Sequence, residues 1–445
     1  MNPTRTDLTL IEVLGSRLEQ SQLVRINGRV VQVVGLVVES QGPDVRVGDL
    51  CSIRFRDSAR SLKAEVVGFR GDRVLLMPLG TLKDVGPGCD VLSMDRPLGV
   101  RVGQSLLGRV LDALGEPMDD KGPVIATDVY PLYAEPPHPL RRQMITTPLP
   151  VGVKVIDGIL TLGTGQRIGI FAGSGVGKST LLGMMARYTE ADVNVIALVG
   201  ERGREVREFV DHDLGEEGLR RSVLVIATSD QPPLIRLKAS LTATAIAEYF
   251  RDEGKNVLLM MDSVTRVARA QREVGLAIGE PPTTRGYTPS VFESLPRLLE
   301  RAGAGERGSI TGVYTVLVEG DDMNEPVADT VRGILDGHIV LSRRIAARNY
   351  YPAVDVLESV SRVMPSIVGR PHLEAAGRVR ELLAVHSEAE DLINIGAYKK
   401  GSNPKIDWAI ENLARVHEFL HQKVNDSFSF SDTEKTLLSL ASTAD

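Results

Sequence analysis

The residues with the clearest chemistry form a glycine-rich loop with consecutive members Gly173, Ser174, Gly175, Val176, Gly177, Lys178, Ser179 and Thr180. Backbone N–H groups of such a loop can surround phosphates, and the ammonium of Lys178 can reach the β- and γ-phosphates of a nucleotide. The Ser179 hydroxyl is placed to ligate the Mg²⁺ that bridges them. The loop therefore predicts a site for ATP and Mg²⁺. Ala172 stands where the pattern usually begins with glycine, which is tolerated if its φ is negative.

The elements around this loop follow in the order that phosphate binding requires. Residues 167–171 predict a buried strand, and residues 179–187 are apolar and strongly helix-forming. The glycine turn then lies at a helix N-terminus, which attracts anions. The alternative is a glycine turn that merely caps an ordinary helix.

A candidate catalytic carboxylate, Glu201, follows a second apolar run. Residues 193–199 predict a strand covered on both faces, which would deliver Glu201 to the carboxyl edge of a parallel sheet, where ligands bind. If this strand lies next to the loop strand or one removed, a spacing of about 4.8 Å per strand puts Glu201 within a water's reach of the γ-phosphate. We assign Glu201 as the base that orients the attacking water. On local sequence alone, a Glu201 that simply starts the next helix is an equally open alternative.

A third apolar run, residues 256–261, ends in Asp262, a carboxylate that can hold Mg²⁺ through its water shell. Apolar strands that end in aspartate are common, so Asp262 gains weight only together with the loop and Glu201. Residues 222–228 add another strand, and residues 233–251 add a long helix that stops near Gly254. This alternation predicts an α/β core with a mainly parallel sheet and helices on both faces.

Residues 99–369 resemble the RecA-like core of the rotary ATPase family. The resemblance rests on the glycine-rich loop, on GERGREV at residues 200–206 and on YPAVDVLESVS at residues 351–361. Residues 279–292, 319–326 and 334–343 look like the protein-export branch of that family, which contains flagellar and injectisome ATPases. Residues 256–266 and 403–407 are more similar to the flagellar version.

The resemblance implies roles that local chemistry leaves open. Arg362 matches the family's arginine finger, which a neighbouring subunit would insert to stabilise the transferred phosphoryl group; an internal salt bridge is the alternative. Tyr351 matches the aromatic residue that packs on adenine, with plain core packing as the alternative. Arg202, beside Glu201 in the GERGREV segment, is a further candidate catalytic residue. A finger requires a partner, and the family precedent is a homohexameric ring.

Length and composition favour several domains. The chain has 445 residues, of which 42% are apolar, and such a length favours about three domains. We expect a partner-binding helix at residues 1–22, a β-barrel at 23–95, the RecA-like core at 96–369 and a C-terminal helical domain at 370–445. The proline-rich residues 131–150 are expected to connect into the core. Ser431 and Glu434 form a capping box that predicts the start of the last helix.

The resemblance also implies protein partners. The N-terminal helix would dock on a peripheral-stalk-like regulator, or pack on its own domain. The C-terminal helices would receive chaperone–cargo complexes, and the ring would meet an export gate at the membrane. Glu319, Asp321, Asp322 and Glu325 place four acids within seven residues. We expect this acidic loop to meet a basic central coiled-coil stalk, with a solvated turn as the alternative.

The expected location is the cytoplasm, with peripheral association at the inner membrane through the export apparatus. No apolar run approaches the roughly 18 residues that span a bilayer, and the N-terminus carries no apolar signal core. Two cysteines without C-x-x-C spacing argue for a reducing compartment.

Several functions remain in competition. We predict Mg²⁺-dependent ATP hydrolysis that energises flagellar protein export by chaperone release or substrate unfolding, with an injectisome ATPase as the alternative. A catalytic subunit of a rotary ATP synthase ranks next, whereas a non-catalytic subunit would not need Glu201. An RNA motor of the termination-helicase kind ranks last, because it needs aromatic residues for base stacking. Residues 23–95 contain no Trp or Tyr and the net charge is −6, so no nucleic-acid partner is expected.

Overall fold

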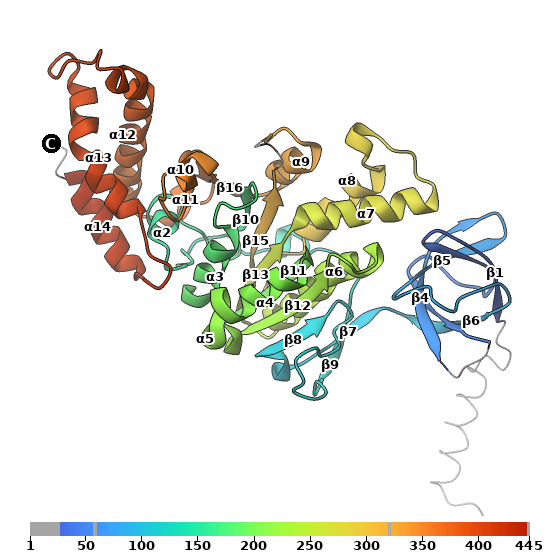
Figure 1. The fold of residues 1–445 in the computed structure, drawn as a ribbon. Coiled ribbons are helices and arrows are strands. Elements are labelled where there is room, and N and C mark those ends of the chain that lie inside the picture. The colour runs from blue at the N-terminus through green and yellow to red at the C-terminus, as the bar shows by residue number, and fades with distance from the viewer. Residues whose placement is uncertain (1–26, 57–59, 319, 321, 443–445) are drawn as a thin grey trace, which may run out of the picture. The chain divides into compact units, whose positions relative to one another are not determined.

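The computed structural model describes residues 27–56, 60–318, 320 and 322–442, and the chain divides into two compact units after Pro97 (Figure 1). The expected helix at residues 1–22 lies outside the described residues. Among the helices of the described part, none combines the length and apolar character needed to span a membrane.

The first unit contains a closed β-barrel with strand order β1-β2-β5-β4-β3-β6, closed by pairing between β6 and β1. Closure leaves no free sheet edge. Apolar side chains from successive strands, among them Val38, Ile53 and Leu76, fill the interior. The predicted β-barrel is confirmed. Its strands are β1 (Gly28–Val34), β2 (Val37–Gln41), β3 (Asp49–Arg54), β4 (Ser61–Arg70), β5 (Arg73–Pro78) and β6 (Asp90–Pro97).

The second unit is built on a large sheet with the path β17-β16-β10-β15-β13-β11-β12-β8. All neighbours from β16 to β8 pair in parallel, while β17 and the short β14 pair antiparallel. A separate ribbon joins β7 to β9. The strands are β7 (Gly99–Val102), β8 (Arg109–Asp112), β9 (Asp128–Pro131), β10 (Arg167–Ala172), β11 (Val193–Glu201), β12 (Ser222–Thr228), β13 (Asn256–Asp262), β14 (Gly303–Ala304), β15 (Ser309–Leu317), β16 (Gly337–Leu341) and β17 (Val354–Ser361).

Helices cover both faces of this sheet, as the continuous apolar strands require. On one face, Leu181 and Met185 of α3 join a core with Ile170 of β10 and Leu198 of β11. On the other face, α6 contacts β11, β12 and β13, and α7 contacts β15 (Figure 1). The helices of the core are α2 (Lys154–Ile159), α3 (Lys178–Tyr188), α4 (Gly203–Glu208), α5 (Gly215–Arg220), α6 (Pro233–Asp252), α7 (Val264–Ile278), α8 (Pro289–Leu299), α9 (Pro326–Ile334), α10 (Arg343–Ala347) and α11 (Met364–Ile367). The predicted α/β core is confirmed.

The C-terminal part is helical, as predicted, and packs on the core of the same unit. α12 contacts α13 and α14, and both α13 and α14 contact α2 (Figure 1). The buried ring of His372 makes a 2.8 Å hydrogen bond between its Nε2 and the Gly158 carbonyl of α2. The three helices are α12 (Arg370–Asn394), α13 (Pro404–Leu420) and α14 (Phe430–Ser442).

Residues 131–150 lie inside the second unit, where the guanidinium of Arg142 donates to the Ala302 carbonyl at 2.8 Å, so this expected connection packs on the core. One local expectation differs from the structure. The capping box at Ser431 is wrong by two residues. α14 begins at Phe430, and the Ser429 hydroxyl accepts the Asp432 N–H at 3.1 Å. Ser429 and Asp432 supply the same chemistry one half-turn earlier.

Candidate nucleotide-binding site

The glycine-rich loop runs from the end of β10 to the start of α3, as predicted. Gly175 and Gly177 have φ values of 78° and 86°, in the left-handed region that glycine tolerates. Ala172 is the last residue of β10, and its φ is not positive, so its side chain causes no backbone strain. The Val176 side chain is buried in the core and anchors the loop, which leaves backbone groups and Lys178 for a ligand.

A cavity of about 920 Å³ opens over this loop. Its floor includes Gly173, Ser174, Gly175, Gly177, Lys178, Ser179 and Thr180, and Glu201 and Arg266 line one wall. Tyr351 and the segment after α13, residues 421–424, also line the cavity. The volume falls in the range of known ligand pockets. Among the predicted loop residues, only Val176 does not line the cavity, since its side chain points into the core.

Lys178 and two carboxylates meet beneath the cavity. The Nζ atom of Lys178 lies 2.5 Å from Oδ1 of Asp262 and 3.7 Å from Oε1 of Glu201. Asp262 also accepts a 2.7 Å hydrogen bond from the Thr315 hydroxyl of the neighbouring strand. All three charged side chains are at most 12% exposed. The structure thus brings together the three candidates that the sequence placed on separate elements.

The strand order differs from the one assumed for Glu201. Two strands, β15 and β13, separate β10 from β11, so the strands that carry the loop and Glu201 are about 14 Å apart. The assumption of adjacent or nearly adjacent strands was wrong. The side chains still meet, because Lys178, Asp262 and Glu201 all lie at the carboxyl edge of the parallel sheet. The long side chain of Lys178 spans the remaining gap.

The environment of Glu201 alters its acidity. Burial is the main cause that raises its pKa to about 7, and the nearby Asp262 carboxylate and a hydrogen bond with Glu205 add to the effect. The positive charges of Lys178 and Arg266 oppose it. Within the described part of the chain, Oε1 of Glu201 is buried without a hydrogen-bond partner. A carboxylate with a pKa near neutrality and a free oxygen is suited to accept a proton from water.

The other predicted residues lie in different places. Arg202 precedes α4 at the cavity wall, but its side chain is 79% exposed and pairs with Glu205 at 3.5 Å. The Tyr351 ring packs against the glycine-rich loop at Gly177. The ring is so close that a Cβ added to Gly177 would lie 3.3 Å from it. Arg362 is exposed and lies outside the cavity of its own chain. Its Nη1 donates to the Leu335 carbonyl at 3.3 Å, and no carboxylate in the described residues pairs with it.

Three polar residues of the cavity were not assigned from the sequence. Arg266 donates from Nη2 to Oε2 of Glu201 at 3.2 Å and also to the Gly200 carbonyl, so it orients the carboxylate. Glu205 bonds to Glu201, and half-buried Asp213 bonds to the side chain of Thr180. Arg266 lies in the first turn of α7, four residues after Asp262, and this position could have pointed to it. No sequence signal marks Asp213.

The acidic loop is only partly described. The Asp322 carboxylate accepts a 2.8 Å hydrogen bond from Nη2 of Arg285, and Glu325 caps α9 by accepting the N–H groups of Val327 and Ala328 at 3.1 Å. Two of the four acids therefore have structural partners within the chain. Glu319 and Asp321 lie outside the described residues.

Oxygen donors near the loop fit a magnesium ion. The exposed Ser179 side chain lines the cavity, and Asp262 lies directly behind the Lys178 ammonium. Mg²⁺ usually binds to one or two protein oxygens and completes its shell with water and phosphate oxygens. The hydroxyl of Ser179 and the carboxylate of Asp262 match that pattern.

Comparison with known proteins agrees with this site and fold. Residues 30–95 match the β-barrel domain of the ATP synthase alpha/beta family, and residues 152–361 match its nucleotide-binding domain. Residues 368–439 match the T3SS EscN ATPase C-terminal domain. The flagellum-specific ATP synthase of Bacillus subtilis (strain 168) is 57% identical over 426 residues, which cover 95% of this chain and 97% of that protein. The chain belongs to the flagellar and type 3 secretion ATPase family.

Other members of this family are nearly as similar. The type 3 secretion system ATPase of Xanthomonas euvesicatoria is 54% identical, over 94% of each chain. The solved structure of the assembled ATPase EscN from the enteropathogenic E. coli type III secretion system is 48% identical, with a TM-score of 0.88. That match covers 93% of this chain and all of the EscN chain. A second EscN structure, in complex with its central stalk EscO, gives a TM-score of 0.86.

Proposed function

We propose that this protein hydrolyses ATP in order to energise type III export of flagellar proteins. One observation carries the proposal: Lys178, Glu201 and Asp262 meet beneath a cavity that the glycine-rich loop lines, in a chain that resembles the flagellum-specific ATP synthase along nearly its whole length. An injectisome ATPase remains the second candidate, since the Xanthomonas euvesicatoria protein is similar at 54% identity.

The loop and its neighbours divide the chemical work. Backbone N–H groups of residues 173–177 bind the phosphates, and Lys178 leaves Asp262 to contact the β- and γ-phosphates. The Ser179 hydroxyl and the Asp262 carboxylate would hold Mg²⁺, which when bound would neutralise phosphate charge. Glu201 orients a water molecule and accepts its proton, and Arg266 fixes the Glu201 carboxylate. Tyr351 packs on adenine beside the glycine-rich loop.

The site is completed by a second copy of the chain. Arg362 is exposed and does not line the cavity over its own glycine-rich loop, as expected of a finger that acts on a neighbouring subunit. Head-to-tail contacts of this kind either close into a ring or continue as a filament. We infer a closed homohexamer, and the assembled EscN structure supports an oligomer in this family. Arg202, at the exposed wall of the cavity, is placed to contact the neighbouring chain.

The partners follow from the same family membership. EscN has been solved with its central stalk EscO, and we propose that a central coiled-coil stalk binds this protein also. We further propose a peripheral-stalk-like regulator at residues 1–22, chaperone–cargo complexes at the C-terminal helices and an export gate at the inner membrane. Chaperone release or unfolding of export substrates would be the outcome of ATP turnover. The expected location is cytoplasmic.

Complementation tests the proposal. In a bacterium that lacks its own flagellar export ATPase, the wild-type chain should restore secretion of flagellar subunits into the medium. Glu201→Gln should bind ATP but leave secretion near the level of the deletion strain. Restored secretion of injectisome substrates, with no effect on flagellar subunits, would favour the second candidate. Secretion restored equally by Glu201→Gln would contradict the role of ATP hydrolysis.

A further inference from the structure

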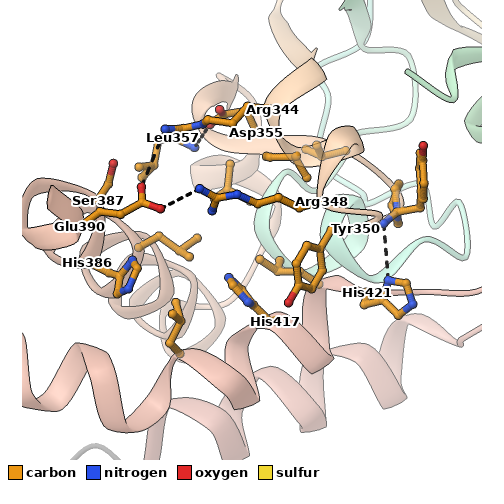
Figure 2. A pocket seen from close by; sticks show the side chains of 18 residues that line it. Arg344, Arg348, Tyr350, Asp355, Leu357, His386, Ser387, Glu390, His417 and His421 are labelled. Carbon is orange, nitrogen blue, oxygen red and sulfur yellow. Dashed lines mark hydrogen bonds and ion pairs between the residues drawn. The ribbon is translucent and has the colours of Figure 1, made fainter. Parts of the chain in front are cut away.

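A second cavity lies beside the nucleotide cavity, between the core and the C-terminal helices (Figure 2). Its volume is about 150 Å³, and α10 and β17 face α12 and α13 across it. Tyr351, Pro352 and His421 line both cavities and so form the wall between them. A cavity of this volume accommodates a ligand the size of a single aromatic ring.

Cationic side chains gather at its mouth. Arg348 pairs with Glu390 at 2.7 Å, and Arg344 approaches the same carboxylate at 3.9 Å. Both guanidinium groups remain more than half exposed, whereas Glu390 is 22% exposed. Such exposed ion pairs exchange partners at little cost in free energy. The two arginines are therefore available to a further anion.

Among the described residues, the rings of two cavity histidines, His386 and His417, have no hydrogen-bond partner. Figure 2 shows dashed lines from Glu390 to both arginines and from His421 to the backbone of Tyr351, but none to the rings of His386 and His417. The His417 ring contacts only the ring of Tyr350 among the described aromatic side chains, with ring centres 5.0 Å apart. Imidazole nitrogens that line a cavity without a partner can bind a ligand's oxygen atoms.

The charges around His417 oppose its protonation in the empty cavity. Burial lowers the pKa of His417 most, and the adjacent His386 and Arg348 lower it further. The other charged or titratable groups around the cavity are Arg344 of α10, Tyr350 and Tyr351, Asp355 of β17, Glu390 of α12 and His421. The Asp355 carboxylate already accepts hydrogen bonds from the N–H groups of Leu357 and Glu358. Cationic groups that lie close together repel one another, and an anion bound among them reduces this repulsion.

The remaining wall is apolar. It is made by Val354 and Val356 of β17, Leu383 of α12, and Leu413 and Leu420 of α13. Together with the Tyr350 ring, these side chains suit a planar hydrocarbon body. The cavity is therefore lined by cationic groups, by the imidazoles of His386 and His417 and by apolar side chains.

We propose that this cavity binds a small organic oxyanion, a carboxylate or phosphate monoester attached to a planar apolar body. The anionic group contacts His386, His417 and Arg348, and the body packs on Tyr350 and the apolar wall. Since Tyr351 lines both cavities, occupancy of the second cavity changes the affinity for ATP, and ATP changes the affinity for the oxyanion by the same factor.

Calorimetric titration of the full chain tests the proposal. The nucleotide cavity is first saturated with ADP and Mg²⁺, so that its glycine-rich loop cannot take up the probe. Benzoate and phenyl phosphate should then bind, and the one that binds more tightly identifies the preferred anionic group. Benzyl alcohol should bind at least tenfold more weakly than benzoate. Inorganic phosphate should also bind more weakly than phenyl phosphate. Equal binding of benzyl alcohol and benzoate, or of inorganic and phenyl phosphate, would overturn the proposal.

Two variants and a pH series locate the binding. His386→Gln and Arg348→Gln should each lower the affinity for benzoate at least tenfold. The matched control is Arg370→Gln, which removes an exposed ion pair with Glu374 on α12 and should leave that affinity unchanged. Benzoate keeps its charge between pH 6 and 8, so wild-type affinity should rise as the pH falls and the His417 ring protonates. Affinity that is independent of pH in the wild type, or unchanged in both variants, would refute the site.

Discussion

The pH dependence of turnover follows from the buried position of Glu201. A base acts only when ionised, and burial raises the pKa of Glu201 to about 7. The ionised fraction then increases about tenfold between pH 6 and pH 8, so kcat/KM for ATP should rise by about that factor, with a midpoint near neutrality. The parameter kcat/KM is the appropriate one, because it reports the pKa of the free enzyme.

Glu201→Gln should remove both the activity and its pH dependence. Loss of a positioned base reduces kcat by about 100- to 10,000-fold, and the residual rate should no longer follow the titration of residue 201. Glu208→Gln is the matched control, since Glu208 lines the same cavity but is half exposed and pairs with Arg204. Steady-state ATPase assays from pH 6 to 8 measure all three proteins. A flat wild-type profile, or a Glu201→Gln rate within tenfold of wild type, would refute the reasoning.

The same pKa predicts a change in stability. A carboxyl pKa raised from 4.5 to about 7 means that folding favours the protonated form. Its contribution to stability is present at low pH and is lost as the pH rises from 4.5 to 7, by up to about 3 kcal/mol. Gln resembles the protonated form, so nucleotide-free Glu201→Gln should have a higher Tm than wild type at pH 8 and a similar Tm at pH 4.5. A lower Tm at pH 8 would contradict the assigned environment.

Three other substitutions test separate parts of the structure. Tyr351→Ala should raise the KM for ATP up to about tenfold with a smaller change in kcat, since it removes an aromatic contact with the nucleotide base; an unchanged KM would exclude that contact. Gly177→Ala should raise KM, because residue 177 has a φ of +86° and its Cβ would lie 3.3 Å from the Tyr351 ring, whereas Gly333→Ala, with open space around its Cβ, should not; equal effects in steady-state assays would contradict this. Arg301→Met should lower the free energy of unfolding by about 3–5 kcal/mol by leaving the Glu248 carboxylate buried and unpaired, and a drop in Tm of only a degree would refute it.

Much of the nucleotide site could be predicted because its chemistry is local in sequence. The glycine-rich loop, the apolar strands and the carboxylates at strand ends all carry signals within about ten residues. Strand order is different, since it depends on which strands pair over long distances. Two strands that come later in the chain insert between β10 and β11, and no local pattern announces them. The position of Glu201 near the γ-phosphate was therefore predicted from an incorrect strand order.

Other features depend on contacts that the sequence does not mark. Ser429 and Ser431 are both plausible helix caps, and only the path of the preceding chain decides between them. Asp213 reaches Thr180 because an irregular helical segment, Phe209–Leu214, bends past α3. The second cavity likewise forms only where α10, β17, α12 and α13 pack together, and no local pattern in the sequence marks that packing.

The central claim is that one chain binds the triphosphate while its neighbour supplies Arg362, and mixed rings test it most directly. Lys178→Ala and Arg362→Ala should each be inactive alone. Mixed in equal amounts under conditions that allow subunit exchange, they should recover about one quarter of the wild-type ATPase rate, because about that fraction of interfaces joins an intact loop to an intact finger. Mixed rings of confirmed composition that show no ATPase activity would contradict the claim.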